Sequence, residues 1–253
     1  MIKIILITGC SSGFGEVTAE YLKNLGYKVI GTTRKELDVT WSFKKIQKTI
    51  TGYGQIDVLI NNAGYGQLGT IADTSEKQIR DQFETNVFGL LKITNAVLPM
   101  MRKQNSGIII NVSSVAGFVT NPHGGIYAAS KFSIEAITQS LRQEEWKNGI
   151  RVTSINPGPF DTKFWDNSKS DIVTQSLLKK AMSRRENPIF FAKKIKEIIE
   201  SDYIYPRYMV GTNAQVMRTL YRVLPDFVLD ILMRFIFGKL SQAQAEPKPD
   251  LSI

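Results

Sequence analysis

Short apolar runs alternate with amphipathic stretches along most of this chain. The runs are rich in isoleucine, leucine and valine, which is typical of strands buried on both faces of a parallel sheet. We expect such strands at residues 3–9, 27–33, 56–64, 107–114 and 150–158. Apolar residues recur at helical spacing between them, over 13–26, 75–104 and 127–149. Strands that alternate with helices predict a doubly wound, Rossmann-like α/β fold: a parallel sheet with helices on both faces.

The segment after the second run departs from this alternation. "LDVT" (37–40) has the pattern of a third strand, but only Lys35 and Glu36 separate it from the end of the second. A crossover between parallel strands takes about a dozen residues or more. We therefore expect a fold shortened here, with no helix and with the third strand either missing or displaced.

The length of 253 residues fits a single domain, which we place at 1–240. The segment 163–201 is expected to supply a loop and helices, and 213–240 a C-terminal helical extension. The last residues, 241–253, are polar and contain proline, so we expect a disordered tail.

Composition narrows the classes of partner. The net charge of +9 favours anionic ligands or surfaces, but no dense Lys/Arg cluster interleaved with aromatics indicates nucleic acid. Cys10 is the single cysteine, so no internal disulfide forms and a reducing, cytoplasmic setting is expected. His123 is the single histidine, which argues against a metal site. The apolar start is too short for a signal peptide, and no apolar run approaches the ~20 residues that span a bilayer.

"TGCSSGFG" (8–15) joins the first strand to the first helix. Glycines at 9, 13 and 15 allow a tight turn and a close approach of ligand to backbone. The helix that follows presents free N–H groups and the positive end of its dipole, which suits a pyrophosphate. By itself this turn favours a ligand site, and a purely structural strand-to-helix connection is the alternative.

Several motifs in fixed order resemble the short-chain dehydrogenase/reductase family. They are "TGCSSGFG", "NNAG" (61–64), Asn86, "NVSS" (111–114), "YAASK" (127–131) and "NPG" (156–158). The resemblance covers about residues 1–165. The later "RYMVG…LPDFVLDILMRF" is similar, more weakly, to the members that act on hydroxysteroids and retinoids.

Tyr127 and Lys131 lie four residues apart, and on a helix this spacing places them on one face. A tyrosine with its usual pKa near 10 is a poor proton shuttle at pH 7, and moving it to about 7 takes roughly 4 kcal/mol. One cation at about 4 Å supplies roughly that much at an effective dielectric of about 20. We therefore expect Lys131 to lower the pKa of Tyr127. Alone, such a pair is more often structural.

The resemblance assigns roles to these residues. It implies that Ser114 hydrogen-bonds the substrate oxygen, Tyr127 moves the proton, Lys131 holds the ribose, and Asn86 supports Lys131. Ser113 is a competing candidate for the serine. The implied cofactor contacts are Gly9, Ser11, Ser12, Gly13, Phe14 and Gly15, Asn62, Ala63 and Gly64, Tyr127 and Lys131, and Pro157, Gly158 and Thr162.

Arg34 follows the second strand, where the resemblance implies a contact with the 2′-phosphate of NADP. Thr33 stands where an NAD enzyme would carry an acid, so we expect NADP rather than NAD. A solvated cation at a strand tip is the alternative reading of Arg34. Asp38 is the residue that the resemblance implies for adenine binding, although the shortened connection leaves its position open.

The combined motifs predict an NADP-dependent oxidoreductase that acts on a carbonyl or alcohol of a small lipophilic substrate, and we expect the chain to form a homo-oligomer. The alternative enzyme is a 3-oxoacyl thioester reductase. An alternative of another class is a non-catalytic module that senses the cofactor, but an intact Ser114, Tyr127 and Lys131 set argues against it.

"LPDFVLDILMRFIF" (224–237) is expected to form a helix with an unusually wide apolar face. Its own domain, a sister subunit or a membrane surface would cover such a face. The neighbouring cations, Arg218, Arg222, Arg234 and Lys239, favour peripheral contact with an anionic bilayer.

Overall fold

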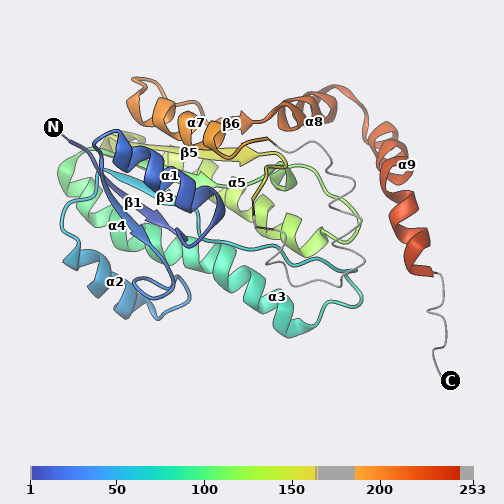
Figure 1. The fold of residues 1–253 in the computed structure, drawn as a ribbon, viewed down its shortest axis with the longest axis horizontal. Helices are drawn as coiled ribbons and strands as arrows, with labels where there is room; N and C mark the ends of the chain where they lie inside the picture. Colours follow the sequence, from blue (N-terminus) through green and yellow to red (C-terminus); the bar gives the residue numbers. More distant parts are fainter. Residues whose placement is uncertain (1, 163, 165–185, 246–253) are drawn as a thin grey trace.

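The computed structural model describes residues 2–162, 164 and 186–245, with 236–245 described by backbone alone. Its centre is a six-stranded parallel sheet in the order β2-β1-β3-β4-β5-β6 (Figure 1). The strands are β1 (Ile4–Thr8), β2 (Lys28–Thr32), β3 (Val58–Asn61), β4 (Gly107–Val112), β5 (Ile150–Pro157) and β6 (Arg207–Val210). The first five confirm the strands predicted from the apolar runs, and β6 had no predicted counterpart.

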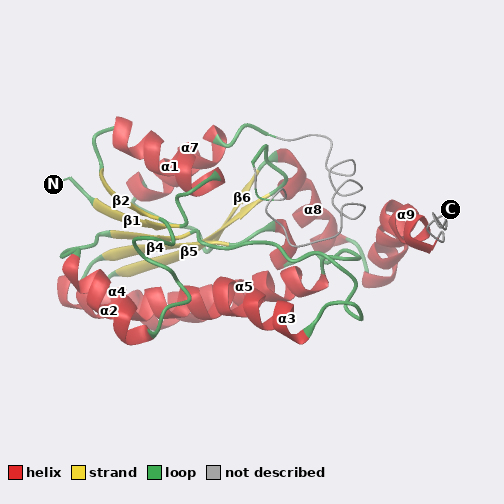
Figure 2. Cartoon of the chain, turned by 60° about the horizontal axis from the view of Figure 1, so that its bottom comes forward, coloured by secondary structure: helices red, strands yellow, loops and turns green. Residues whose placement is uncertain are grey.

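Helices cover both faces of this sheet, as the pattern predicted (Figure 2). One face carries α1 (Gly13–Asn24) and α7 (Ile189–Glu200). The other carries α2 (Phe43–Gly52), α4 (Leu90–Gln104) and α5 (Gly125–Glu145). Most of the segment 163–201 lies outside the described residues. Its described end, α7, is a sheet-covering helix whose apolar face is buried in the core.

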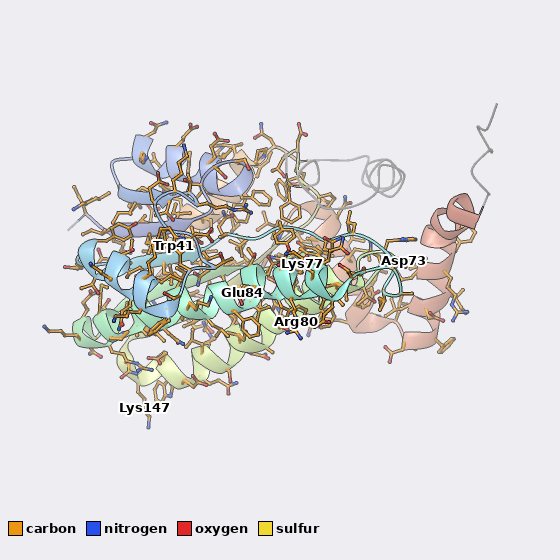
Figure 3. The ribbon with its side chains drawn as sticks, turned by 90° about the horizontal axis from the view of Figure 1, so that it is seen from below. Trp41, Asp73, Lys77, Arg80, Glu84 and Lys147 are labelled. Carbon is orange, nitrogen blue, oxygen red and sulfur yellow. The ribbon has the colours of Figure 1, made fainter. Side chains whose placement is uncertain are left out.

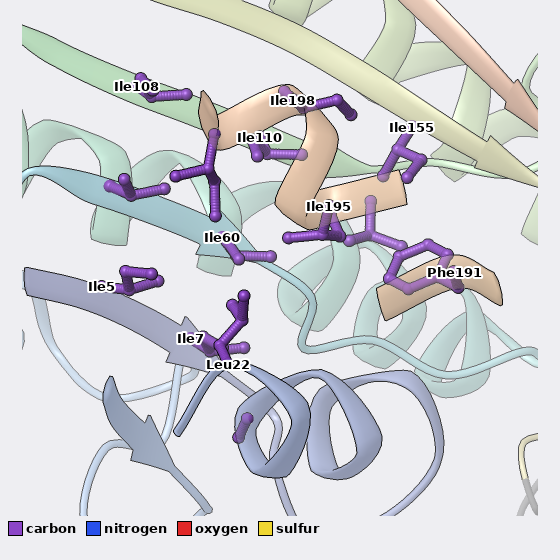
Figure 4. Close-up of a cluster of buried hydrophobic side chains, with 14 of the residues drawn as sticks. Ile5, Ile7, Leu22, Ile60, Ile108, Ile110, Ile155, Phe191, Ile195 and Ile198 are labelled. Carbon is purple, nitrogen blue, oxygen red and sulfur yellow. The ribbon is translucent and has the colours of Figure 1, made fainter. Parts of the chain in front are cut away.

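The side chains of each strand alternate between two hydrophobic clusters. Ile5 and Ile7 of β1 pack toward α1 and α7 (Figure 4), whereas Leu6 between them packs toward α2 and α4. Burial on both faces is why the strands are continuous apolar runs rather than alternating ones.

The long helical pattern over 75–104 forms three consecutive segments: α3 (Glu76–Phe83), a π-helical turn η1 (Glu84–Gly89), and α4. A capping box between Ser75 and Gln78 is present at the start of α3. The π turn contains Asn86. Such turns insert one residue into a helix and are frequent at functional sites.

No described strand or helix lies between β2 and residue 40, so the prediction of no helix here is confirmed, and of the two alternatives for the third strand the structure shows that it is missing. β2 is the edge of the sheet, and "LDVT" instead packs on the long helix. Leu37 and Val39 are buried, and a Cβ on Gly89 would come 2.8 Å from Val39. Trp41 and Glu84 lie on the same lower side of the molecule (Figure 3), where Lys92 donates to the Trp41 carbonyl and pairs with Glu84.

The chain continues into α8 (Thr212–Val223) and α9 (Asp226–Ala245), and α9 stands away from the sheet (Figures 1 and 2). The helix therefore continues five residues into the tail expected to be disordered, and 246–253 lie outside the described residues. A single domain over 1–240 stays a prediction. Among the described helices, none has the length and apolarity to cross a bilayer.

The wide apolar face predicted for α9 is partly buried and partly exposed in the structure. Leu229 is buried, whereas Phe227, Ile231 and Phe235 are 68%, 64% and 82% exposed. These three are spaced by four residues and form one uncovered row along α9.

Candidate active site

A cleft of about 870 Å³ opens at the carboxyl ends of the strands, where ligands bind in open α/β sheets. Of the site residues predicted from the sequence, all except Gly15 and Asn86 line it. These are Gly9, Ser11, Ser12, Gly13, Phe14, Arg34, Asp38, Asn62, Ala63, Gly64, Ser114, Tyr127, Lys131, Pro157, Gly158 and Thr162. Residues more than a hundred positions apart in the sequence therefore share one wall.

The glycine turn forms the floor of the cleft. Gly9 has a φ of +73°, and a Cβ there would come 2.7 Å from the Cα of Ala63. Gly15 lies behind the turn, since its Cβ would meet the Gly9 carbonyl oxygen at 2.3 Å, so it serves close packing rather than the cleft wall. The Asn62 amide donates to the Thr8 and Gly9 carbonyls at 2.9 and 3.0 Å and ties the two turns together.

The start of α1 faces this floor with unused donors. Its N-cap residue, Ser12, makes no side-chain capping bond, so the first backbone N–H groups stay available to a ligand. Backbone without side chains and a helix N-terminus together suit a pyrophosphate. This end of the cleft therefore fits a dinucleotide.

The opposite wall carries the three residues expected to be catalytic. Ser114 caps a short 3-10 helix, η2 (Val115–Gly117), and hydrogen-bonds Tyr127. Tyr127 is 6% exposed at the start of α5. One turn later, the Lys131 Nζ donates to the Val112 carbonyl at 2.9 Å and lies 5.7 Å from the centre of the Tyr127 ring.

Burial sets the protonation of this pair. It raises the pKa of Tyr127 to about 12, against the hydrogen bond from Ser114, which lowers it. It lowers the pKa of Lys131 to about 8, against the charge of Glu135, which raises it. The expected lowering of the Tyr127 pKa is therefore wrong for the protein alone, because desolvation outweighs the hydrogen bond from Ser114. Tyr127 is a buried, protonated group at neutral pH.

Ser113 and Asn86 stand beside the cleft in different ways. Ser113 also lines it but is buried, and its hydroxyl donates to the Lys131 carbonyl at 3.5 Å. Asn86 binds the main chain of Tyr65 through both its side-chain groups and donates to Ser130 Oγ at 3.0 Å. Asn86 thus joins the π turn to the helix that carries Lys131, and its catalytic role stays a prediction.

The far end of the cleft is lined by Arg34 and several acids. Glu84 pairs with Lys92, and Asp81 pairs with Lys77 at 2.9 Å. The Asp38 Oδ1 accepts from the Thr40 N–H and hydroxyl at 2.9 and 2.8 Å. Among the described residues, Arg34 has no salt bridge and is exposed, so it is available to an anionic ligand.

Sequence reasoning missed part of the cleft wall. The additional residues are Thr33, Lys35, Leu37, Val39, Thr40, Tyr65, Asp81, Glu84, Thr85, Val112, Phe160 and Phe164. Several of them reach the cleft because "LDVT" packs on the long helix, which no local pattern indicates. The Phe164 ring lies 5.8 Å from that of Tyr127.

Comparison with known proteins agrees with this geometry. The family model described as short chain dehydrogenase matches residues 37–172. A 3-ketodihydrosphingosine reductase of Bacteroides thetaiotaomicron is 42% identical over 94% of this chain and 91% of its own length. A short-chain dehydrogenase structure from Streptomyces avermitilis has a TM-score of 0.80 at 29% identity, covering 97% of this chain and 99% of that one.

A short chain dehydrogenase structure from Burkholderia cenocepacia, solved in complex with NADP, has a TM-score of 0.76 and covers 97% of this chain and 98% of that one. At 22% identity, this last likeness shows the fold alone. The resemblance to the hydroxysteroid and retinoid branch stays a prediction. With the family model across more than half of the sequence and the cleft built as described, this chain is a member of the short-chain dehydrogenase/reductase family and an NAD(P)-dependent oxidoreductase.

Proposed function

We propose that this chain uses NADPH to reduce a ketone on a lipophilic substrate to a secondary alcohol, with Tyr127 as proton donor. The observation that carries the proposal is the buried hydroxyl of Tyr127, which bonds Ser114 on the cleft wall and keeps its proton at neutral pH. The relative from Bacteroides thetaiotaomicron supports the substrate class, since its name gives a long-chain ketone.

The residues present fit the dinucleotide along the length of the cleft. The pyrophosphate would lie at the start of α1 beside Gly13, Arg34 would bind the 2′-phosphate of the adenine ribose, and Asp38 would hold the adenine. Lys131 would hold the second ribose, with Pro157, Gly158 and Thr162 beside the nicotinamide. When bound, the cofactor supplies a hydride to the carbonyl carbon.

The protein supplies the proton and the fixed donors. As the carbonyl oxygen gains negative charge, the hydroxyls of Ser114 and Tyr127 stabilise it by hydrogen bonds. Tyr127 then gives its proton to that oxygen, which completes the alcohol. The cation of Lys131, one turn away, stabilises the phenolate that remains, and this effect is largest at the moment the proton leaves.

The preference for NADPH rests on charge at the far end of the cleft. The neighbouring acids Asp81 and Glu84 are paired with lysines, whereas Arg34 is exposed beside Thr33. A guanidinium binds a phosphate through two parallel hydrogen bonds. This arrangement favours the 2′-phosphate over a bare 2′-hydroxyl.

A cofactor-oxidation screen tests the proposal. NADPH and NADH are each offered with long-chain 3-keto amines, ketosteroids, retinal and 3-oxoacyl thioesters. We expect turnover with NADPH and a long-chain ketone. Turnover confined to the thioesters would favour the alternative 3-oxoacyl reductase, and tight NADPH binding without turnover on any carbonyl would favour a cofactor sensor.

We further propose that α9 brings the protein to an anionic membrane, from which a lipophilic substrate reaches the cleft. The observation is the uncovered row of Phe227, Ile231 and Phe235, with Arg222 and Arg234 exposed nearby. A helix with one apolar row and cations beside it suits the boundary of a bilayer. The alternative is that a second copy of this chain buries the exposed row of α9 in a dimer.

Flotation with vesicles of phosphatidylglycerol and phosphatidylcholine tests the membrane contact. We expect the protein to float at low salt, and the triple variant Phe227→Ser, Ile231→Ser and Phe235→Ser to stay in solution. The matched control replaces three exposed apolar residues away from α9: Ile2→Ser, Trp146→Ser and Phe190→Ser. Equal flotation of both variants, or a dimer that dissociates only in the α9 variant, would overturn the proposal.

A further inference from the structure

α5 carries a buried carboxylate that the mechanism above does not use. Glu135 is 7% exposed and follows Lys131 by four residues, as Lys131 follows Tyr127. The three side chains therefore lie along one face of the helix. A buried carboxylate is costly unless it is paired and hydrogen-bonded. Its partners indicate what it holds.

One oxygen of Glu135 connects it to Ser114. Its Oε1 accepts from the Asn156 amide at 2.7 Å, and the same amide nitrogen donates to the Ser114 carbonyl at 3.1 Å. The two hydrogens of the amide are thereby both used. Gly117 permits this approach, since a Cβ there would come 3.0 Å from the Glu135 Cγ. Asn156 thus bridges the carboxylate to the main chain of Ser114.

The other oxygen holds the carboxylate in the sheet. Oε2 accepts from the Arg207 Nε at 2.5 Å and from the Ser154 hydroxyl at 3.1 Å. Arg207 comes from β6 and Ser154 from β5. The orientation of Glu135 is therefore fixed by two strands that do not themselves carry Ser114 or Lys131.

Charged groups surround Glu135 from three elements. Arg207 pairs with it from β6, and Lys131 precedes it by one turn of α5. Burial lowers the pKa of Arg218 of α8, as do Arg207 and Arg222, and the nearby charge of Glu135 raises it. The negative charge of Glu135 also raises the pKa of Lys131 against desolvation. The carboxylate is thus a counter-charge for Lys131, whose Nζ donates to the neutral carbonyl of Val112.

We propose that Glu135 is a positioning residue for the reaction: it fixes the Ser114 main chain through Asn156, and it is the counter-charge of Lys131 on the same face of α5. The proposal rests on the proposed function for its catalytic consequence, but not for its effect on Lys131. Loss of the carboxylate charge would release the Lys131 proton at lower pH. Loss of the bond to Asn156 would leave the Ser114 loop less firmly held.

The lysine half is tested without substrate or cofactor. Spectra of the protein labelled with ¹³C at the lysine Cε carbons follow the titration of Lys131, whose signal is assigned by its loss in Lys131→Arg. In Glu135→Gln we expect the titration midpoint to fall by about half to one pH unit, the effect of one partly compensated charge at this range. An unchanged midpoint would refute this half, even if no carbonyl substrate were ever found.

The positioning half is tested by the pH profile of NADPH-dependent reduction. In Glu135→Gln the alkaline limb of the pH–rate profile should shift to lower pH together with the titration midpoint of Lys131. The value of kcat should fall by about tenfold to a hundredfold. Glu135→Asp keeps the charge but shortens the reach to Asn156, so its limb should stay near that of the native protein while kcat falls. A wild-type kcat in both variants would overturn the assignment.

A matched control exists on the same helix. Glu145 is 1% exposed and paired with Arg102 at the far end of α5, so Glu145→Gln removes an equally buried carboxylate away from the cleft. It should lower the melting temperature without moving the Lys131 midpoint or the pH profile. If Glu135→Gln does not fold, Asn156→Ser tests the same bridge with the Glu135–Arg207 pair intact. An unchanged kcat in Asn156→Ser would then contradict the proposal.

Discussion

Removing the Tyr127 hydroxyl tests its role as proton donor with little change to the packing of the site. The Tyr127→Phe change keeps the buried ring, including its packing near Phe164 and below Lys131. What is lost is the hydrogen bond with Ser114 and the proton itself. A buried hydrogen bond contributes about 1 kcal/mol, so the free energy of unfolding should change by no more than about that.

The catalytic loss should be much larger. A positioned general acid contributes about 10²- to 10⁴-fold, which corresponds to roughly 3–5 kcal/mol of activation free energy. We therefore expect kcat to fall at least about a hundredfold, while the dissociation constant of NADPH changes less than about threefold.

Single-turnover oxidation of bound NADPH measures the chemical step, and fluorescence titration measures NADPH binding. Tyr27→Phe is the control, because its hydroxyl also donates one hydrogen bond, to Glu200 at the end of α7 at 2.7 Å, and neither residue lines the cleft. Residual turnover above about a tenth in Tyr127→Phe would refute Tyr127 as the proton donor.

Three further changes test other parts of the structure. Arg34→Ala should raise the KM for NADPH at least about tenfold and leave that for NADH nearly unchanged; equal losses for both cofactors in steady-state assays would contradict a phosphate contact. Gly89→Ala should push Val39 off the long helix and lower both thermal stability and NADPH affinity, and a variant with native values in calorimetry would show that the segment yields freely. Arg102→Ala should cost about 1–3 kcal/mol at pH 7 in urea unfolding: Arg102 lowers the pKa of Glu145, so this stability is present above the unfolded pKa and fades as pH falls through the folded one. A cost that is the same in acid would disprove that linkage.

The local pattern of the sequence predicted five of the six strands and most helices, and its motifs singled out the candidate catalytic residues. A strand buried on both faces must be apolar throughout. β1, β3 and β4 can therefore be recognised from their own residues, without knowledge of the strands that pair with them. Likewise, the spacing of Tyr127 and Lys131 fixes their common face as soon as the helix is known. The absence of residues for a crossover helix was also a local fact, and it predicted that no helix follows β2 before residue 37.

The tertiary structure alone decided how those residues behave. Burial raised the pKa of Tyr127 and lowered that of Lys131, because desolvation depends on what packs around a group and not on its neighbours in sequence. The bridge from Glu135 through Asn156 to Ser114 likewise joins three segments that meet only when α5 packs on the sheet. On α9, the sequence showed an apolar face, but only the packing showed which part of it is covered: Leu229 is buried while Phe227, Ile231 and Phe235 are exposed.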